Sequence, residues 1–211
     1  MTRALRASLL HGIYAIVDEE PRALEIARAA LAAGVRIVQY RAKDGVVDAR
    51  LRALRELTRA YHALLILDDD WRAAIAYECD GVHLGPGDEG FADPASVRAG
   101  LPELVIGLSC GSEEEARAAE PGADYLGIGA VYATNSKRDA GAPIGIDGLR
   151  RIASSTRLPV AAIGGISLEN LREIRESGVA MAATISAIAR DPNPGDAARR
   201  LVALWNDGSP T

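Results

Sequence analysis

The fold of this chain is decided by residues 36–69, which read RIVQYRAKDGVVDARLRALRELTRAYHALLILDD. Two short apolar runs, 36–42 and 63–69, flank the segment 48–62, whose apolar side chains recur with the period of an amphipathic helix. The apolar runs are nearly continuous rather than alternating, which is typical of parallel strands covered on both faces. The stretch therefore predicts two parallel strands joined by a crossover helix.

The same alternation extends over the rest of the chain. Helical patterns occupy 168–177 and 196–206, and Ser112 with Glu115 forms the capping box of another helix. Eight βα repeats favour closure into a barrel, and the absence of a G-x-G-x-x-G after the first run argues against a dinucleotide-binding sheet. We therefore predict an α/β fold, a (β/α)8 TIM barrel that forms a single domain over residues 1–211. The other strand-like runs are 12–18, 81–85, 104–110, 125–131, 158–165 and 181–186.

The composition limits the classes of function. Of the 211 residues 48% are hydrophobic and 25% are charged, with a net charge of −5, which excludes disorder and gives no general basis for nucleic-acid binding. No apolar run approaches the roughly 20 residues of a membrane helix, and the N-terminus lacks the apolar core of a secretory signal. Cys79 and Cys110 are too few for a disulfide framework. We therefore predict a cytoplasmic protein without a membrane partner.

Polar residues follow the second strand where packing would not select them. In a (β/α)8 barrel the active site lies at the carboxyl ends of the strands. Gln39, Arg41 and Lys43 alternate by two and therefore point the same way, as a carboxamide and two cations beside an anionic group would. The alternative is an ordinary solvated strand end.

Carboxylates follow the third and fourth strands. Asp68, Asp69 and Asp70 end the run 63–69, and Asp88 follows the run 81–85. Two carboxylates from adjacent strand ends could hold Mg²⁺, which is usually shared between one or two carboxylates and substrate phosphates. The alternative is that they are ordinary turn residues, with Asp70 capping the next helix.

The later strand ends carry groups suited to anions. Ser109 can donate to a phosphate oxygen, and the polar loop 132–145 carries hydroxyls beside Lys137. Gly165 and Ser186 follow the seventh and eighth strands, the recurrent phosphate site of these barrels.

The chain offers no strong base for the chemistry. His83 is interpreted as a structural histidine, and neither a zinc spacing nor a G-x-S-x-G motif is present. Several cations without a base indicate catalysis by charge stabilisation, as the departure of a pyrophosphoryl group requires.

The motifs that carry a family resemblance are VQYRAKD (38–44), DGVHLGPGDE (80–89), IGLS (106–109), DYLGIGAVYATNSKRDAG (124–141), AIGGIS (162–167) and TISAI (184–188). In this order and spacing they resemble the thiamine phosphate synthase family over nearly the whole chain. The resemblance implies a Mg²⁺-dependent transferase. Its small-molecule substrates would be 4-amino-2-methyl-5-hydroxymethylpyrimidine diphosphate and a thiazole phosphate, and its products thiamine phosphate and pyrophosphate.

The resemblance also implies roles for individual residues, with Arg41, Lys43 and Lys137 as the catalytic cations. Asp68 stands among the substrate contacts where the family usually has Asn. Contacts to the pyrimidine and its diphosphate would come from Gln39, Tyr40, Arg41, Ala42, Lys43, Ser109 and Lys137. The thiazole side would be lined by Thr134, Asn135 and Ser136, its phosphate held by Gly165, Ile185 and Ser186, and Mg²⁺ held by Asp69 and Asp88.

Two other functions remain open at this point. A thiazole tautomerase would share the barrel and the thiazole phosphate site, although the His that such isomerases use near the fifth strand is absent, with Gly111 near that position. A non-catalytic protein that binds thiazole or thiamine phosphate would result if Asp68 had impaired the diphosphate site. Trp71 and Trp205 leave self-association into a homo-oligomer open.

Overall fold

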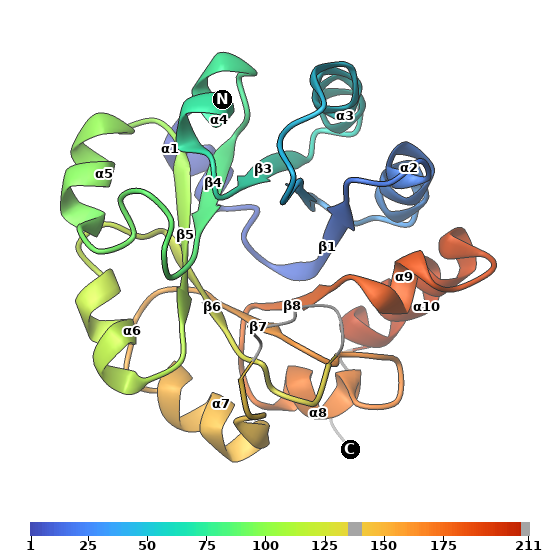
Figure 1. The fold of residues 1–211 in the computed structure, drawn as a ribbon. Helices are drawn as coiled ribbons and strands as arrows, with labels where there is room; N and C mark the ends of the chain where they lie inside the picture. The colour runs from blue at the N-terminus through green and yellow to red at the C-terminus, as the bar shows by residue number, and fades with distance from the viewer. Residues whose placement is uncertain (135–140, 208–211) are drawn as a thin grey trace.

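The computed structural model describes residues 1–134 and 141–207. Within these residues eight parallel strands close in chain order into a barrel, and β8 pairs with β1 (Figure 1). This confirms the predicted (β/α)8 barrel. The strands are β1 (Gly12–Asp18), β2 (Ile37–Arg41), β3 (Leu64–Asp68), β4 (Gly81–Leu84), β5 (Val105–Cys110), β6 (Tyr125–Ile128), β7 (Val160–Ile163) and β8 (Met181–Thr184).

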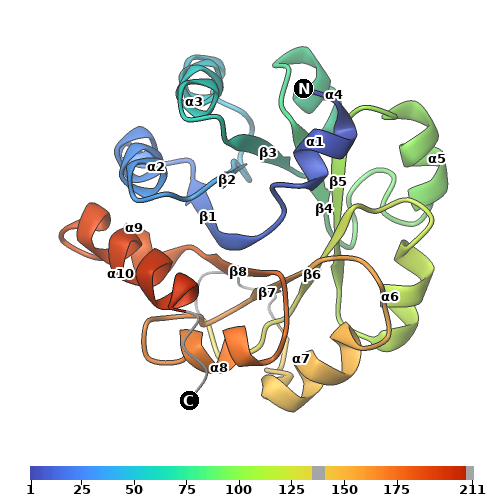
Figure 2. The same ribbon diagram turned by 180° about the vertical axis from the view of Figure 1, so that it is seen from behind.

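Helices alternate with the strands and surround them on the outside, as Figures 1 and 2 show from opposite sides. The helical segments predicted at 48–62, 168–177 and 196–206 are confirmed as α3, α8 and α10 with small shifts of their ends. The described helices are α1 (Arg3–Ala7), α2 (Ala23–Ala32), α3 (Asp48–Ala60), α4 (Trp71–Ala76), α5 (Pro94–Gly100), α6 (Glu113–Ala119), α7 (Gly145–Ala153), α8 (Leu171–Glu176), α9 (Ser186–Ala189) and α10 (Pro194–Asn206).

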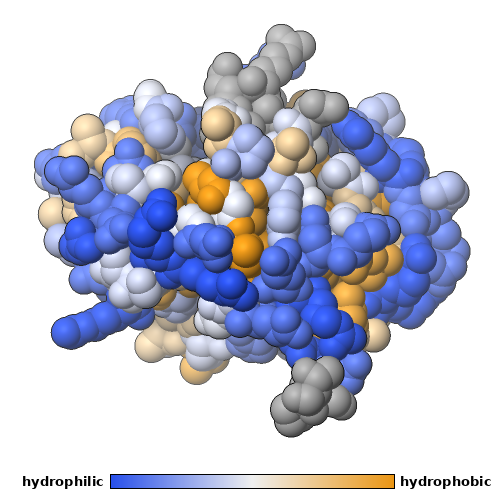
Figure 3. Space-filling view, turned by 90° about the horizontal axis from the view of Figure 1, so that it is seen from below, coloured by the Kyte–Doolittle hydropathy of each residue, from blue (hydrophilic) through white to orange (hydrophobic). Residues whose placement is uncertain are grey.

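Two apolar layers explain why the strands lack clean alternation. One layer fills the barrel and includes Tyr14, Ile37, Leu64 and Tyr125. The other lies between the strands and the helices, so residues of both strand faces are buried. The outer helix faces are polar, and the surface seen in Figure 3 is mainly hydrophilic, with hydrophobic residues exposed near the centre of the view and to the right of it. In the described part of the chain, no helix is both long and apolar enough to cross a membrane.

Several strands are shorter than the sequence predicts. The run 125–131 pairs as a strand only to Ile128, and the run 158–165 only over Val160–Ile163. Val131 is nevertheless fully buried, and its N–H donates to the Ile163 carbonyl at 2.8 Å. These residues are apolar because they are buried in loops at the barrel rim, which a hydrophobic pattern does not distinguish from a strand.

The predicted caps of two helices are confirmed. The Asp70 carboxylate accepts from the N–H of Ala73 at 2.9 Å and begins α4. Ser112 accepts from the N–H of Glu115 and begins α6, while Glu115 reaches back to the N–H of Gly111 rather than to Ser112. Both helices therefore begin where the sequence places them.

The amino end of the barrel is closed by α1, which lies beside β4 and β5 in Figure 2. Arg6 of α1 and Arg55 of α3 both bind Asp80, which directly precedes β4 and is 2% exposed. Arg55 occupies a polar position of the amphipathic segment 48–62, yet Asp80 draws its side chain into a part-buried ion pair instead of leaving it in solvent. In the same way, Arg3 and Arg98 bind Asp124 in front of β6.

Candidate active site

The carboxyl ends of β2 and β3 bring a cation against two carboxylates. Lys43 Nζ lies 3.0 Å from Asp68 Oδ2 and 2.6 Å from Asp69 Oδ2. Burial lowers the pKa of Lys43, but the hydrogen bond to Asp69 and the charge of Asp68 outweigh it, so the net shift is upward. The lysine therefore stays charged, and it partly neutralises both acids.

The carboxylates are crowded enough to resist ionisation. Burial, followed by the charge of Asp69, raises the pKa of Asp68 to about 6. Burial also raises the pKa of Asp88, and the nearby charge of Asp69 raises it further, while its carboxylate accepts from the N–H of Gly85 at 2.6 Å. The predicted pair Asp69 and Asp88 is thus brought together from the ends of β3 and β4.

The donor set suits a divalent cation that is shared with a ligand. Among the described residues, no group of three or more His, Cys, Asp or Glu is arranged as a metal cage. Two adjacent carboxylates that repel each other fit Mg²⁺, which keeps several waters and takes further oxygens from phosphates. The residues therefore fit a cation that completes its coordination with the substrate.

The polar side chains of β2 lie on two different faces of the strand, one toward the inside of the barrel and one toward the helices. Gln39 points into the barrel, where its Nε2 donates to Tyr14 Oη at 3.0 Å, and Arg41 Nε donates to Asp18 Oδ1 at 2.5 Å. Tyr40 points outward into the layer under the helices, where its hydroxyl donates to Glu19. The structure therefore brings Gln39, Arg41 and Lys43 to one side, as alternation predicts, but not the Tyr40 side chain. Ala42 is half-buried between Arg41 and Lys43.

Ser109 and His83 occupy the neighbouring strand ends. His83 Nε2 lies 3.0 Å from Ser109 Oγ, and His83 Nδ1 lies 3.0 Å from the Tyr125 hydroxyl. A Cβ at Gly85 would lie 3.5 Å from Asp88 Oδ2 and 3.6 Å from Ser109 Oγ, so the carboxylate and the hydroxyl face the same space. The sequence-based interpretation of His83 as a satisfied structural residue agrees with these two contacts.

A small cavity of about 330 Å³ lies at the ends of β7 and β8. Its lining residues include Thr134, Gly165, Ser167, Ser186 and Arg190. A Cβ at Gly165 would lie 2.7 Å from the Ala133 carbonyl oxygen, and the residue has a φ of +67°, so glycine is needed for the loop to approach. The predicted residues Thr134, Gly165 and Ser186 are therefore brought together, and Ile185 packs beside them against the inner core.

Three of the candidates, Asn135, Ser136 and Lys137, fall outside the described residues, and two residues at the carboxyl end of the barrel were not predicted from the sequence. Arg190 and Asp18 are not among the residues singled out from the sequence, although Asp18 ends the first strand and could have been found there. Arg190 follows a short helix, and no motif marks it as a lining residue.

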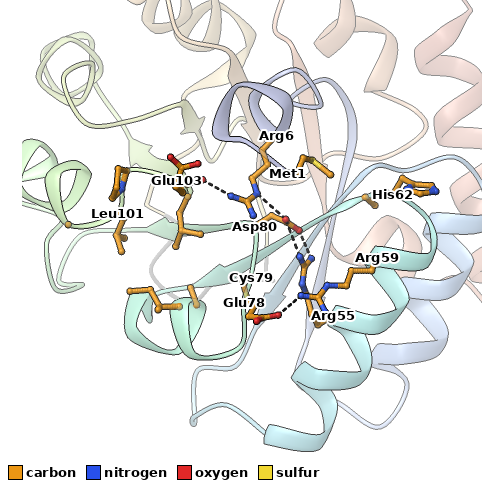
Figure 4. Close-up of a pocket in the computed structure, with 16 residues that line it drawn as sticks. Met1, Arg6, Arg55, Arg59, His62, Glu78, Cys79, Asp80, Leu101 and Glu103 are labelled. Carbon is orange, nitrogen blue, oxygen red and sulfur yellow. Dashed lines mark hydrogen bonds and ion pairs between the residues drawn. The ribbon is translucent and has the colours of Figure 1, made fainter.

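A larger cavity, of about 680 Å³, lies at the opposite end of the barrel (Figure 4). Its lining charges are mostly paired with one another, since Arg6 and Arg55 bind Asp80 and Arg59 binds Glu78. The amino ends of barrel strands serve stability rather than catalysis. The candidate active site is therefore the carboxyl end, where several strands contribute charged groups.

Known proteins resemble this chain in both sequence and fold. The family model for thiamine monophosphate synthase matches residues 13–188. Thiamine-phosphate synthase of Archaeoglobus fulgidus is 44% identical over 91% of this chain and 92% of its own length. That of Moorella thermoacetica is 43% identical over 84% and 86%. A solved thiamine phosphate pyrophosphorylase from Pyrococcus furiosus superposes with a TM-score of 0.83 at 38% identity, covering 95% of this chain and 97% of that one. The chain therefore belongs to the thiamine monophosphate synthase family.

Proposed function

We propose that this protein condenses 4-amino-2-methyl-5-hydroxymethylpyrimidine diphosphate with a thiazole phosphate to give thiamine phosphate and pyrophosphate. The observation that carries the proposal is the grouping of Lys43 with Asp69 and Asp88 at the same barrel end as the cavity around Gly165 and Ser186. One side of this rim thus offers a cation-and-carboxylate cluster, and the other side of the same rim offers a small polar cavity. Two phosphorylated substrates need two such places.

The diphosphate would lie over the ends of β2 to β5. Arg41 and Lys43 would neutralise its oxygens, and the Ser109 hydroxyl would donate to one of them, a role supported by their common position at these strand ends. Asp69 and Asp88 would hold Mg²⁺, which when bound offsets the charge of the leaving group. Lys137 is proposed as a further cation from the loop after β6.

The chemistry needs charge stabilisation rather than a side-chain nucleophile. The bond between the exocyclic methylene carbon and the diphosphate oxygen breaks, and its electron pair leaves with pyrophosphate. The amino group of the ring releases electrons to the resulting methylene cation, which the thiazole nitrogen then captures. Arg41, Lys43 and Lys137 stabilise the departing charge, and holding the two rings face to face supplies the rest.

The thiazole phosphate would lie in the cavity at β7 and β8. Backbone N–H groups near Gly165 and Ser186 suit the recurrent phosphate position of such barrels. Arg190 lines the same cavity and would add a positive charge there. Ser167 and Thr134 would add hydroxyl groups.

The test is pyrophosphate release measured with both substrates, with and without Mg²⁺. The proposal expects release only when both substrates and Mg²⁺ are present. Thiazole isomerisation without release would favour the tautomerase alternative, and calorimetric binding of thiazole phosphate without turnover would favour a binding protein. Asp68→Asn should be assayed beside the wild type, because removing its negative charge is expected to lower the KM for the diphosphate.

A further inference from the structure

A line of hydrogen bonds crosses the inside of the barrel from β2 to β5. Gln39 Nε2 lies 3.0 Å from Tyr14 Oη, and Tyr14 Oη lies 2.8 Å from Tyr125 Oη. Tyr125 Oη lies 3.0 Å from His83 Nδ1, and His83 Nε2 lies 3.0 Å from Ser109 Oγ. The line therefore joins two proposed substrate contacts, Gln39 and Ser109, through three residues without a role in the proposed reaction.

The barrel is built around this line. Tyr14 and Tyr125 are at most 2% exposed, and Gln39 is 4% exposed. A Cβ at Gly107 would lie 2.1 Å from Tyr125 Cζ and 2.5 Å from His83 Nδ1. A Cβ at Gly127 would lie 2.9 Å from His83 Cε1. Two glycines on β5 and β6 thus leave the space in which the two rings meet, so the contact is specified by the sequence of both strands.

The available donors determine which group donates and which accepts in each hydrogen bond of the line. The Gln39 amide nitrogen can only donate, so Tyr14 accepts there and passes its own single hydrogen to Tyr125. Tyr125 then donates to Nδ1 of His83, and a neutral imidazole must carry its proton on Nε2. That proton is donated to Ser109 Oγ, and the Ser109 hydrogen remains available to the mouth of the barrel.

If every hydrogen bond of the line ran the opposite way, the Ser109 hydroxyl could not donate to an anion. This reversal requires the Gln39 amide to turn so that its oxygen faces Tyr14, and every hydroxyl in the line then reverses. The Ser109 hydrogen would be given to His83 Nε2, so the hydroxyl could not donate to an anion. The orientations of the Gln39 amide and the Ser109 hydroxyl are therefore coupled, because a buried donor left without an acceptor is costly.

We propose that Tyr14, Tyr125 and His83 are positioning residues that fix the Gln39 carboxamide and the Ser109 hydroxyl in the orientations that receive the pyrimidine diphosphate. The Nε2–H tautomer of His83 is the state that carries this orientation. The inference rests on the proposed function, since Gln39 and Ser109 act on substrate only if that function holds.

The first test measures the tautomer in the wild-type protein at pH 8. The chain has three histidines, so the ¹⁵N spectrum of the imidazole nitrogens is simple, and a His83→Asn variant identifies the signals of His83 by their loss. We expect a protonated Nε2 and a bare Nδ1. A protonated Nδ1, alone or together with Nε2, overturns the proposal, and this readout does not depend on catalysis.

The second test removes single hydroxyl groups. In Tyr125→Phe and Tyr14→Phe we expect the KM for the pyrimidine diphosphate to rise about tenfold, while the KM for the thiazole phosphate stays within twofold. In Tyr125→Phe the His83 nitrogen signals should also move toward each other as the tautomers mix. Tyr77→Phe is the control, because its hydroxyl binds Asp48 on the outer surface at 2.6 Å, and it should match the wild type.

The possible outcomes distinguish the positioning role of these residues from the proposed function. Unchanged kinetics in both variants, or equal rises in both KM values, overturn the positioning role. A wild-type protein that releases no pyrophosphate contradicts the proposed function instead. If Tyr125→Phe does not fold, Tyr14→Phe and the wild-type tautomer decide the question.

Discussion

Lys43 of the second strand end is paired with Asp69 of the third, their nitrogen and oxygen 2.6 Å apart. The charge of the same carboxylate acts on Asp88 from the fourth strand end and raises its pKa. A proposed phosphate ligand and a proposed metal ligand thus satisfy one another in the protein alone. A substrate phosphate that binds Lys43 and a cation that binds Asp69 would therefore compete with this contact, because each would bind one of its two partners.

This pairing predicts how the enzyme responds to Mg²⁺. In Asp69→Asn and in Asp88→Asn the Mg²⁺ concentration that gives half-maximal pyrophosphate release should rise at least tenfold, because each change removes a charged oxygen ligand. Asp147→Asn, on an exposed helix position, should leave it unchanged. An unchanged Mg²⁺ requirement in both variants would remove these carboxylates from the metal site.

A second prediction concerns Lys137. Lys137→Ala should fold normally and release pyrophosphate on the order of 100-fold more slowly, because one preorganised charge on a leaving group is worth about 3 kcal/mol. Thermal unfolding by circular dichroism checks the fold, and a steady-state assay checks the rate. Lys137→Arg should recover part of the activity. Full activity of the alanine variant would refute the assigned role.

A third prediction separates the two substrate positions. Arg190→Gln should raise the KM for the thiazole phosphate about tenfold, because a guanidinium–phosphate contact is lost. The KM for the pyrimidine diphosphate should stay constant, since Arg190 lines the cavity at β7 and β8 and not the cluster of Lys43 with Asp69. Arg199→Gln, whose side chain pairs with Asp196 on the outside, serves as the control. Equal effects of both changes would argue against a phosphate contact.

The ion-pair network at the amino end of the barrel predicts that a substitution of Asp80 lowers the stability of the fold without changing the catalytic residues. Asp80 accepts from Arg6, from Arg55 and from the N–H of Leu65. Asp80→Ala leaves these donors unpaired, so the free energy of unfolding should fall by about 3 kcal/mol. Glu25→Ala, which removes a fully exposed ion pair, should leave the free energy of unfolding nearly unchanged. Denaturant unfolding measures both, and equal losses would contradict the buried network.

The two buried thiols predict that the stability of the folded protein depends on pH. Burial raises the pKa of both Cys79 and Cys110 to about 12, whereas a thiol in the unfolded chain has a pKa of about 8.5. The unfolded chain therefore releases these protons first, and the folded state loses stability as the pH rises from about 9 toward 12. At pH 8 a thiol reagent should label neither cysteine before denaturant is added. Rapid labelling of the native protein would show that one thiol is accessible.

The sequence by itself determined the order of the elements and most of their positions. Continuous apolar runs and helical periods are local properties, so the strand–helix alternation, the Asp70 cap and the shared side of Gln39, Arg41 and Lys43 followed from neighbours along the chain. A parallel barrel then brings every strand's carboxyl end to one rim. The candidates could therefore be assigned to one site before any contact was known.

The tertiary structure alone decided which of these groups touch. Lys43 meets Asp69 from 26 residues away, and Tyr14 meets Tyr125 across 111 residues, distances over which no periodicity carries information. Arg55 is turned inward by Asp80, and Arg190 lines a cavity together with Thr134 and Gly165, which follow other strands. Such contacts arise because closure of the barrel buries charges, and a buried charge is costly unless it is paired. Its partner is the opposite charge that lies nearest in space, whatever the separation along the chain.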